Sequence, residues 1–355
     1  MSHRHHAADL RAFATALLDA AGMDSARSPV IAEVLVEADL LGHDTHGLNL
    51  LPAYLADMEK GELATSGEPG VIADFPAALT WDGRRLPGTW LVTQAIDLAC
   101  QRAATQGSCT VAIRRSHHIA CLAAYLTRAT DRGFVIQIMT SAPENRSVAP
   151  FGGREGVITP NPIAAGWPTD GDPVLIDVST SITTNGMVGR LAKSGERLPG
   201  QWLVDGQGRA TDDPAVTTGE PRGWLLPVGG LEYGHKGYAL GLMVEAFTQG
   251  LGGHGRADAV EGWTGEVFVQ VLDPRLFAGL EAFTRQTGWT AAACRNTPPL
   301  PGVERVRLPG ERGLALKRRQ LAEGVSLHPG ILPALEPWAR KLAVPVPERA
   351  TRAAP

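Results

Sequence analysis

The sequence has few of the features that mark secreted, disulfide-bonded or membrane proteins. Its 355 residues include only four cysteines, Cys100, Cys109, Cys121 and Cys294, and none of them stands in C-x-x-C spacing. This pattern favours reduced, buried thiols. No apolar run is long enough to span a bilayer, and no apolar signal core follows the histidine-rich N-terminus. We therefore expect a cytoplasmic protein that has no membrane partner and whose first residues form a short disordered tail.

An excess of basic residues is also missing. The chain has 33 Lys and Arg against 37 Asp and Glu, a formal net charge of −4, without a basic block. This balance argues against a nucleic acid as the main partner. Hydrophobic residues make up 44% and charged residues 20%, which is ordinary for a globular protein, and the length suffices for two domains. We expect the partner to be a small molecule.

Several well-known catalytic motifs are absent as well. There is no G-x-S-x-G, no H-E-x-x-H and no complete phosphate-binding loop. Residues 250–255 satisfy G-x-G-x-x-G, but they follow a predicted helix and do not open one, so we interpret them as a glycine-rich turn. Lys236 stands just before a helix predicted at 237–249, where backbone N–H groups favour an anion. A solvated lysine is the alternative.

The stretch 111–125 is the most informative one. Residues 111–113 are predicted to end a buried strand. Residues 114–118 are predicted to form a polar turn, and residues 121–130 to form a helix. His117 and His118 thus lie where a strand meets a helix, a position suited to proton transfer near neutral pH. Surface or capping roles are the alternative. With His43, Asp44 and His46 they also offer a metal set, but the ligand spacing of known motifs is missing, and we expect no metal.

The order of predicted elements indicates the fold class. Helices are predicted at 8–21, 25–41, 49–60, 90–106, 121–130, 237–249, 280–287, 313–322 and 329–342. Strands are predicted at 77–81, 108–113, 134–139, 156–159, 174–178, 202–204, 224–227 and 267–272, with loops at 61–76 and 140–153. Helices do not separate the strands regularly, so a mixed or largely antiparallel sheet is favoured over a doubly wound parallel one.

An ordered series of short motifs resembles one family. The segments Gly-His-Asp-Thr-His-Gly at 42–47 and Arg-Arg-Ser-His-His-Ile-Ala at 114–120 are similar to two signatures of the type-2 malate/L-lactate dehydrogenases. This family includes sulfolactate and ureidoglycolate dehydrogenases and cyclic ketimine reductases. Further matches follow in the same order at 149–153, 161–164, 177–181, 211–214, 236–238 and 308–311. The resemblance covers about residues 8–342.

The resemblance implies an α/β (α+β) fold unlike the Rossmann fold. A helical substrate and dimer domain would comprise residues 1–75 and 300–345. A mixed, mainly antiparallel sheet in residues 76–299 would bind NAD or NADP, and residues 346–355 would form a disordered tail. The resemblance further implies a homodimer with its active sites near the interface.

The resemblance to the type-2 malate/L-lactate dehydrogenases also implies a role for individual residues, by their position in the motifs. His118 matches the general acid/base, and His46 belongs with it in the catalytic site. The residues implied for the substrate pocket are Thr45, Tyr54, Ser141 and Arg146. Those implied for the cofactor are Asn161, Asp177, Ser179, Thr180, Ser181, Lys236 and Gly237.

One departure from the family pattern concerns the substrate. Leu50 stands where relatives often carry an arginine suited to a carboxylate. Arg146, and after it Arg115, are the candidate replacements. We expect a dehydrogenase or reductase of a small C=O or C=N compound, with poor activity on pyruvate and oxaloacetate. The alternatives are a cyclic imine reductase, a catalytically silent metabolite-binding homologue and a histidine-metal hydrolase.

Overall fold

The computed structural model describes residues 4–260 and 262–348, and it has a mixed α/β architecture. Among these residues, seven strands form one twisted sheet in the order β2-β3-β4-β11-β5-β6-β7, and only the β3–β4 pair is parallel. Their bounds are β2 Gly70–Phe75, β3 Ala78–Asp82, β4 Ser108–Ser116, β5 Val135–Ser141, β6 Ile163–Trp167, β7 Val174–Val178 and β11 Gly265–Leu272. The predicted mixed, mainly antiparallel sheet is confirmed.

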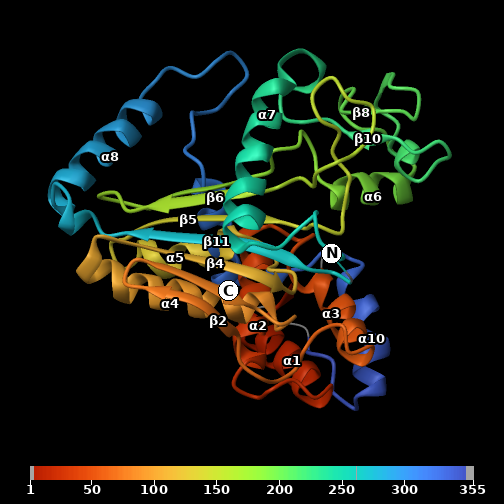
Figure 1. Cartoon of the computed structure of the whole chain (residues 1–355), viewed down its shortest axis with the longest axis horizontal. Coiled ribbons are helices and arrows are strands. Elements are labelled where there is room, and N and C mark those ends of the chain that lie inside the picture. Colours follow the sequence, from red (N-terminus) through yellow and green to blue (C-terminus); the bar gives the residue numbers. More distant parts are fainter. Residues whose placement is uncertain (1–3, 261, 349–355) are drawn as a thin grey trace.

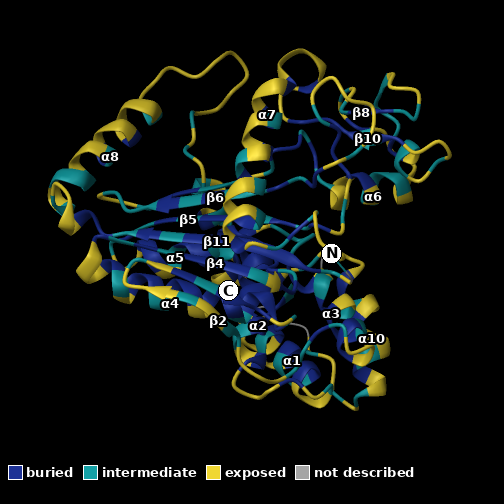
Figure 2. Cartoon of the chain, in the orientation of Figure 1, coloured by how far each residue is buried: buried dark blue, intermediate teal, exposed yellow. Residues whose placement is uncertain are grey.

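Helices cover both faces of this sheet (Figure 1). On one face, α4 (Gly88–Gln106) packs on β4 and β11, and α5 (Ala123–Thr130) packs on β5 and β6. On the other face stand α7 (Gly230–Glu245) and the π-helical turn η3 (Ala246–Gly250). The two faces of the central strands are therefore both buried, which explains their nearly continuous apolar sequences (Figure 2).

The two ends of the chain meet below the sheet. Strand β1 (Arg4–His5) pairs with β12 (Val325–Ser326), and α9 (Glu311–Glu323) packs on α2 (Ser28–Leu41). The other helices of this region are α1 (Ala7–Ala20), η1 (Leu48–Leu50), α3 (Leu51–Glu59) and α10 (Ile331–Lys341). The expected disordered N-terminal tail is wrong for Arg4 and His5. Residues 349–355 of the expected C-terminal tail lie outside the described residues.

A smaller apolar cluster lies beyond α7. It contains Val148, Ile158, Val188, Leu198, Leu203 and Leu225. Around it run α6 (Asn185–Ser194), β8 (Leu203–Val204), β9 (Ala210–Thr211), η2 (Pro214–Thr217) and β10 (Trp224–Leu225). The remaining elements are η4 (Pro274–Leu276) and α8 (Leu280–Arg295), at the far end of the large sheet (Figure 1). Among the described residues, no helix is both long and apolar enough to cross a membrane.

Several predicted boundaries are wrong. The predicted loop 61–76 contains β2, and the predicted strand 156–159 is only an isolated bridge between Val148 and Ile158. β6 and α6 were not predicted. Strand β4 continues through Arg114 to Ser116, because its end pairs with Asp82 on one side and Gly265 on the other. The tertiary pairing of β4 thus overrides the polar sequence that predicted a turn.

Candidate active site

His118 lies just after β4, in a turn held by backbone hydrogen bonds. The His117 N–H donates to the Leu86 carbonyl at 3.1 Å, and Ala120 takes a left-handed conformation with φ of 59°. The Tyr125 hydroxyl, from α5, donates to the Ile119 carbonyl. These contacts fix the backbone on both sides of His118, so the imidazole projects from a rigid position.

The His118 imidazole is engaged at one nitrogen. The Tyr54 hydroxyl lies 3.0 Å from Nδ1 of His118, and the Ala120 backbone nitrogen lies 3.2 Å from the same atom. Among the described residues, Nε2 has no hydrogen-bond partner. Nε2 is therefore the nitrogen available to exchange a proton with a bound molecule.

Aromatic rings surround His118. The Trp263 ring centroid lies 4.3 Å from that of His118, and the His46 centroid lies 5.9 Å away. Burial lowers the pKa of His118 well below its usual value, and the neighbouring His46 and His117 lower it further. The ring is consequently neutral at physiological pH, and its Nε2 accepts a proton in the tautomer whose Nδ1–H donates to the Tyr54 hydroxyl.

The two adjacent histidines have different roles. His117 is buried, and its Nε2 lies 3.0 Å from a carboxylate oxygen of Asp57 on α3. This hydrogen bond holds the pKa of Asp57 below its ordinary value. His117 therefore ties the end of β4 to α3, while His118 is left for chemistry. The sequence suggested both as candidates, and the structure separates them.

His46 and Thr45 belong to the same site. The Thr45 hydroxyl lies 2.8 Å from Nδ1 of His46, and burial lowers the His46 pKa. Their loop is held by Asp39 on α2, whose carboxylate accepts from the Leu48 N–H at 2.8 Å. Burial raises the pKa of Asp39 to about 8. The predicted residues Thr45, His46, Tyr54 and His118 thus lie together.

The predicted cofactor residues form a second cluster. The Val228 N–H donates to the Thr180 carbonyl at 2.9 Å, and the Gly237 N–H donates to the Val228 carbonyl at 3.2 Å. A side chain on Gly237 would lie within 2.8 Å of both backbones, so only glycine permits this approach. Asn161, with φ of 42°, is buried nearby and donates to the Gly241 carbonyl at 3.1 Å.

Other details of this cluster differ from expectation. Lys236 does not precede a helix: α7 begins at Gly230, after a turn in which Gly229 and Gly230 both have positive φ. Its exposed amine therefore projects from the second turn of α7, and an anion site at the helix start is wrong for it. The hydroxyls of Ser179 and Thr180 both donate to the Pro160 carbonyl, and Ser181 donates to the Thr183 carbonyl.

Asp177 lies between the two clusters. Its carboxylate accepts from the Ala123 N–H at 2.8 Å, at the start of α5, and its charge opposes the lowering of the His46 pKa. A ligand atom of Asp177 also lies within 4.8 Å of those of His43 and Cys121. Burial and Asp177 raise the pKa of the Cys121 thiol well above its usual value, which disfavours the thiolate that a metal requires.

Two residues predicted for the substrate pocket, Ser141 and Arg146, make no hydrogen bond with His118 in the part of the chain that the structure describes. The Ser141 hydroxyl is buried against Thr248, at 2.7 Å, and accepts from Gln249, both in η3. Arg146 is exposed on its loop. Leu50 is partly buried and packs on the main apolar core.

Trp263, which stacks on His118, was not predicted, because the segment 256–262 has no regular pattern that places it.

The G-x-G-x-x-G segment behaves as expected from its context. It begins at the end of η3, and in the described residues no helix follows Gly255 before β11. Its Gly255 N–H instead donates to the Asp258 carboxylate at 2.8 Å. The segment is a turn that returns the chain from α7 to the central sheet.

Comparison with known proteins agrees with this architecture and with the order of the motifs. The family described as malate/L-lactate dehydrogenase matches residues 5–336. The chain is 34% identical to an L-lactate dehydrogenase of Cupriavidus necator over 325 residues, which are 89% of this chain and 91% of that protein. The fold is similar, with a TM-score of 0.92, to a malate dehydrogenase from Entamoeba histolytica. The two are 24% identical over 98% of this chain and 100% of the other.

A reductase is also among the similar structures. The δ1-piperideine-2-carboxylate reductase from Pseudomonas syringae is 27% identical, with a TM-score of 0.84 over 95% of this chain and 99% of its own. The mixed sheet and the ordered motifs therefore have one explanation. The chain belongs to the malate/L-lactate dehydrogenase family and is an enzyme of the dehydrogenase and reductase type.

Proposed function

We propose that the protein is an NAD(P)-dependent oxidoreductase that interconverts a 2-hydroxy acid, or a related compound, with its C=O or C=N form. The observation that carries this proposal is the His118 imidazole, held at Nδ1 by Tyr54 and open at Nε2. When bound, the nicotinamide supplies the hydride chemistry. His118 takes the proton from the substrate heteroatom during oxidation and returns it during reduction.

Residues around α7 fit the cofactor in their chemistry. Lys236 offers an exposed cation for a phosphate, and Gly237 lets α7 approach the 177–181 turn closely. Asp177, Ser179, Thr180, Ser181 and Asn161 lie around the same junction. Since three of these hydroxyls already donate to backbone carbonyls, we assign to them the shaping of the turn, and to Lys236 the direct contact.

A thermal shift measurement tests the cofactor. NADH or NADPH at millimolar concentration is expected to raise the melting temperature by mass action. Replacement of Lys236 by Gln should weaken this protection, whereas replacement of the exposed Lys193 on α6 should leave it unchanged. If neither cofactor shifts the melting temperature of the wild-type protein, the oxidoreductase proposal fails.

The reduction of a cyclic imine is a second candidate. It is favoured by the structural similarity to the piperideine-2-carboxylate reductase and by the apolar Leu50, which stands where relatives often carry an arginine. A panel of small 2-oxo acids, cyclic imino acids and neutral ketones, assayed with both cofactors, distinguishes the two. Efficient turnover of pyruvate or oxaloacetate, unaffected by Arg146→Ala, would contradict the expectation drawn from Leu50.

We further propose that the protein acts as a homodimer. Helix α7, beside the cofactor cluster, exposes Leu231, Tyr233, Leu240 and Leu242, each by 44% or more of its surface. An apolar surface of this kind on a helix is suited to a second copy of the chain. Light scattering after size-exclusion chromatography is expected to give twice the chain mass of 37.6 kDa, and a monomer would contradict the proposal.

A further inference from the structure

The indole of Trp263 packs against three rings of the candidate active site, and none of the proposed roles involves it. Its ring centroid lies 4.3 Å from that of His118, and the planes of the two rings are tilted by 31°. The rings of His117 and Tyr54 meet the indole at 64° and 60°, with centroids 5.3 Å and 6.0 Å away. His118 is thus the nearest of the three partners and the closest to parallel stacking.

The sheet fixes the position of Trp263 relative to His118. Two residues after Trp263, Gly265 begins β11 and pairs with Ser116 at the end of β4. Strand β4 in turn leads directly into the turn that carries His118. The indole is partly buried and packs on the main apolar core. The two stacked residues are therefore anchored to one pair of neighbouring strands, and the stacking follows from the fold.

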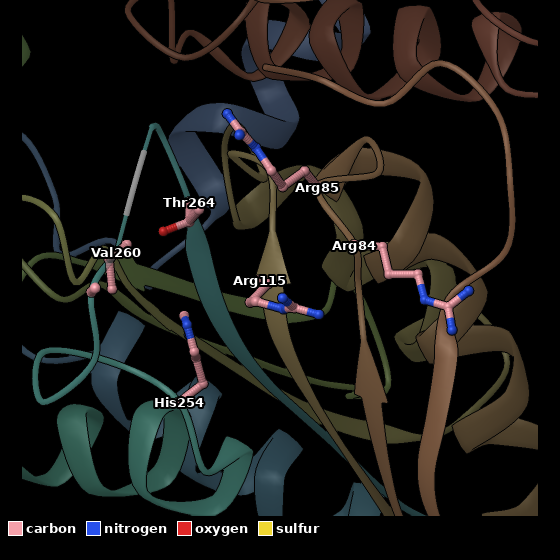
Figure 3. A pocket seen from close by; sticks show the side chains of 7 residues that line it. Arg84, Arg85, Arg115, His254, Val260 and Thr264 are labelled. Atoms are coloured by element: carbon pink, nitrogen blue, oxygen red, sulfur yellow. The ribbon is translucent and has the colours of Figure 1, made fainter. Parts of the chain in front are cut away.

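The hydrogen bond of Thr264 adds a second support. Thr264 borders a cavity of about 340 Å³, so packing is incomplete on this side of the chain (Figure 3). Its hydroxyl donates to the Glu144 carboxylate at 3.3 Å. The loop of Glu144 is held by Arg256, whose Nη1 donates to the Pro143 carbonyl at 3.1 Å and to the Asn145 carbonyl at 2.6 Å. These contacts limit the freedom of the neighbouring indole.

A positive charge on His118 would have no carboxylate beside it. The titratable side chains that face its ring come from α3, from the loop after α2 and from the end of β4: Tyr54, His46 and His117. The Asp57 carboxylate lies 3.0 Å from His117, and the Asp177 carboxylate accepts from the Ala123 N–H at 2.8 Å. Within the described residues, no carboxylate makes a hydrogen bond or an ion pair with His118. A proton on Nε2 therefore lacks a negatively charged partner.

The face of an aromatic ring stabilises a positive charge. The π-electrons make the face of indole negative, and a cation within about 6 Å of the ring centroid is attracted to it. The 4.3 Å separation from Trp263 places the His118 ring within this range. Burial and the two histidine neighbours lower the pKa of His118, so they oppose the protonated form. The indole face acts in the opposite direction and favours it.

We propose that Trp263 is a positioning residue for proton transfer: its ring keeps the His118 imidazole in its orientation and stabilises the imidazolium that forms during turnover. This inference rests on the proposed function. In oxidation, a hydride leaves the substrate carbon for the oxidised nicotinamide, and the proton of the substrate heteroatom moves to Nε2 of His118. In reduction, the proton returns from Nε2 to the heteroatom. The indole stabilises the protonated ring in both directions.

Histidine NMR of the protein without substrate or cofactor tests the ring pair. The His118 signal is assigned from its absence in His118→Asn and followed as the pH is lowered. Trp263→Leu keeps an apolar side chain but removes the aromatic face, so its His118 should titrate at lower pH than in the wild type. Trp263→Phe should lie between the two. Trp338→Leu removes a partly buried ring from the same core, on α10, and should titrate like the wild type.

Two results of the titration would overturn the proposal. An unchanged midpoint in Trp263→Leu would show that the indole does not stabilise the imidazolium. A midpoint at higher pH would show that the ring only excludes water from His118.

Turnover in the reductive direction gives the second measurement. His118 must then carry the proton, so kcat falls as the pH rises. With the best substrate of the panel described above, this fall should occur at lower pH in Trp263→Leu, and kcat at neutral pH should be about 3-fold to 30-fold lower than in the wild type. A lower kcat with an unmoved pH profile would refute the proposal in favour of a purely structural role. A lowered NMR midpoint, without turnover of any panel substrate by the wild type, would support the effect of Trp263 on His118 and contradict the oxidoreductase.

Discussion

The Tyr54 hydroxyl lies 3.0 Å from Nδ1 of His118, although the two residues are 64 positions apart. Tyr54 comes from α3 in the N-terminal part of the chain, and His118 follows the central strand β4. The contact fixes the orientation of the imidazole across these two parts of the molecule. It leaves Nε2 without a partner in the described residues, and the first two predictions follow from the proton-transfer role that we propose for it.

His118→Asn and His118→Ala should lower turnover by about 10²-fold to 10⁴-fold, because the proton donor and acceptor is removed. Cofactor affinity, measured by fluorescence titration, should remain nearly unchanged. His46→Ala should act more through the KM of the substrate. The exposed His328, mutated to Asn, serves as the control. Turnover of His118→Ala close to that of the wild type would exclude the assigned role.

Tyr54→Phe keeps the ring and removes only the hydroxyl. We expect kcat to fall by about 3-fold to 10-fold, in line with the loss of one hydrogen bond of roughly 1 kcal/mol. The pH profile of kcat should also shift, because the hydroxyl contacts the titrating ring. Tyr125→Phe is the comparison variant: its hydroxyl bonds the Ile119 backbone carbonyl beside His118, so the change should lower kcat without shifting the pH profile. An unshifted pH profile in Tyr54→Phe would argue for a purely structural contact.

The lowered pKa of His118 links stability to pH. Its folded-state pKa lies below the unfolded value of 6.5, so below about pH 6.5 the unfolded chain binds more protons than the folded one. The stability contribution is therefore present above this pH and is lost as the pH falls towards the folded pKa. Melting temperatures measured between pH 7.5 and 5 should fall, and they should fall less steeply in His118→Asn. Parallel curves for both proteins would contradict the burial of a neutral ring.

The contribution of Asp39 to the stability of the fold should depend on pH in the opposite direction. Its pKa is raised from 3.8 to about 8, so the folded state holds its proton more tightly, and the stability this provides is lost as the pH rises from about 4 to 8. Asp39→Asn keeps a neutral side chain of similar shape. We expect the stability difference between wild type and Asp39→Asn to move in favour of the variant between pH 5 and 9. Denaturant unfolding at each pH measures this, and a constant difference would be inconsistent with it.

Gly237→Ala should disturb the junction between α7 and the 177–181 turn. The added carbon would lie 2.4 Å from the Val228 backbone nitrogen, which requires a backbone shift that typically costs about 1–3 kcal/mol. Thermal protection by the cofactor should weaken as well. Gly189→Ala, in α6, meets no heavy atom within 4 Å and should stabilise the helix slightly. Equal behaviour of the two variants would show that the close approach at Gly237 has no role.

Local sequence patterns determined much of the fold. The apolar spacing of α1 and α2, the stop at Gly42 and the alternation of short strands are local properties, because helix faces and turns depend on residues a few positions apart. The same holds for the G-x-G-x-x-G segment, which was recognised as a turn from its neighbours alone. The ordered motifs also predicted His118, His46 and Tyr54 as site residues, although no local pattern shows that they meet.

The tertiary structure decided what each side chain contacts. His117 and His118 are chemically identical neighbours, and only the position of Asp57 on α3 and of Tyr54 beside it makes one structural and the other available. Strand β4 ends at Ser116 because β3 and β11 pair with it. Contacts between residues far apart in the chain depend on packing, which no local pattern encodes.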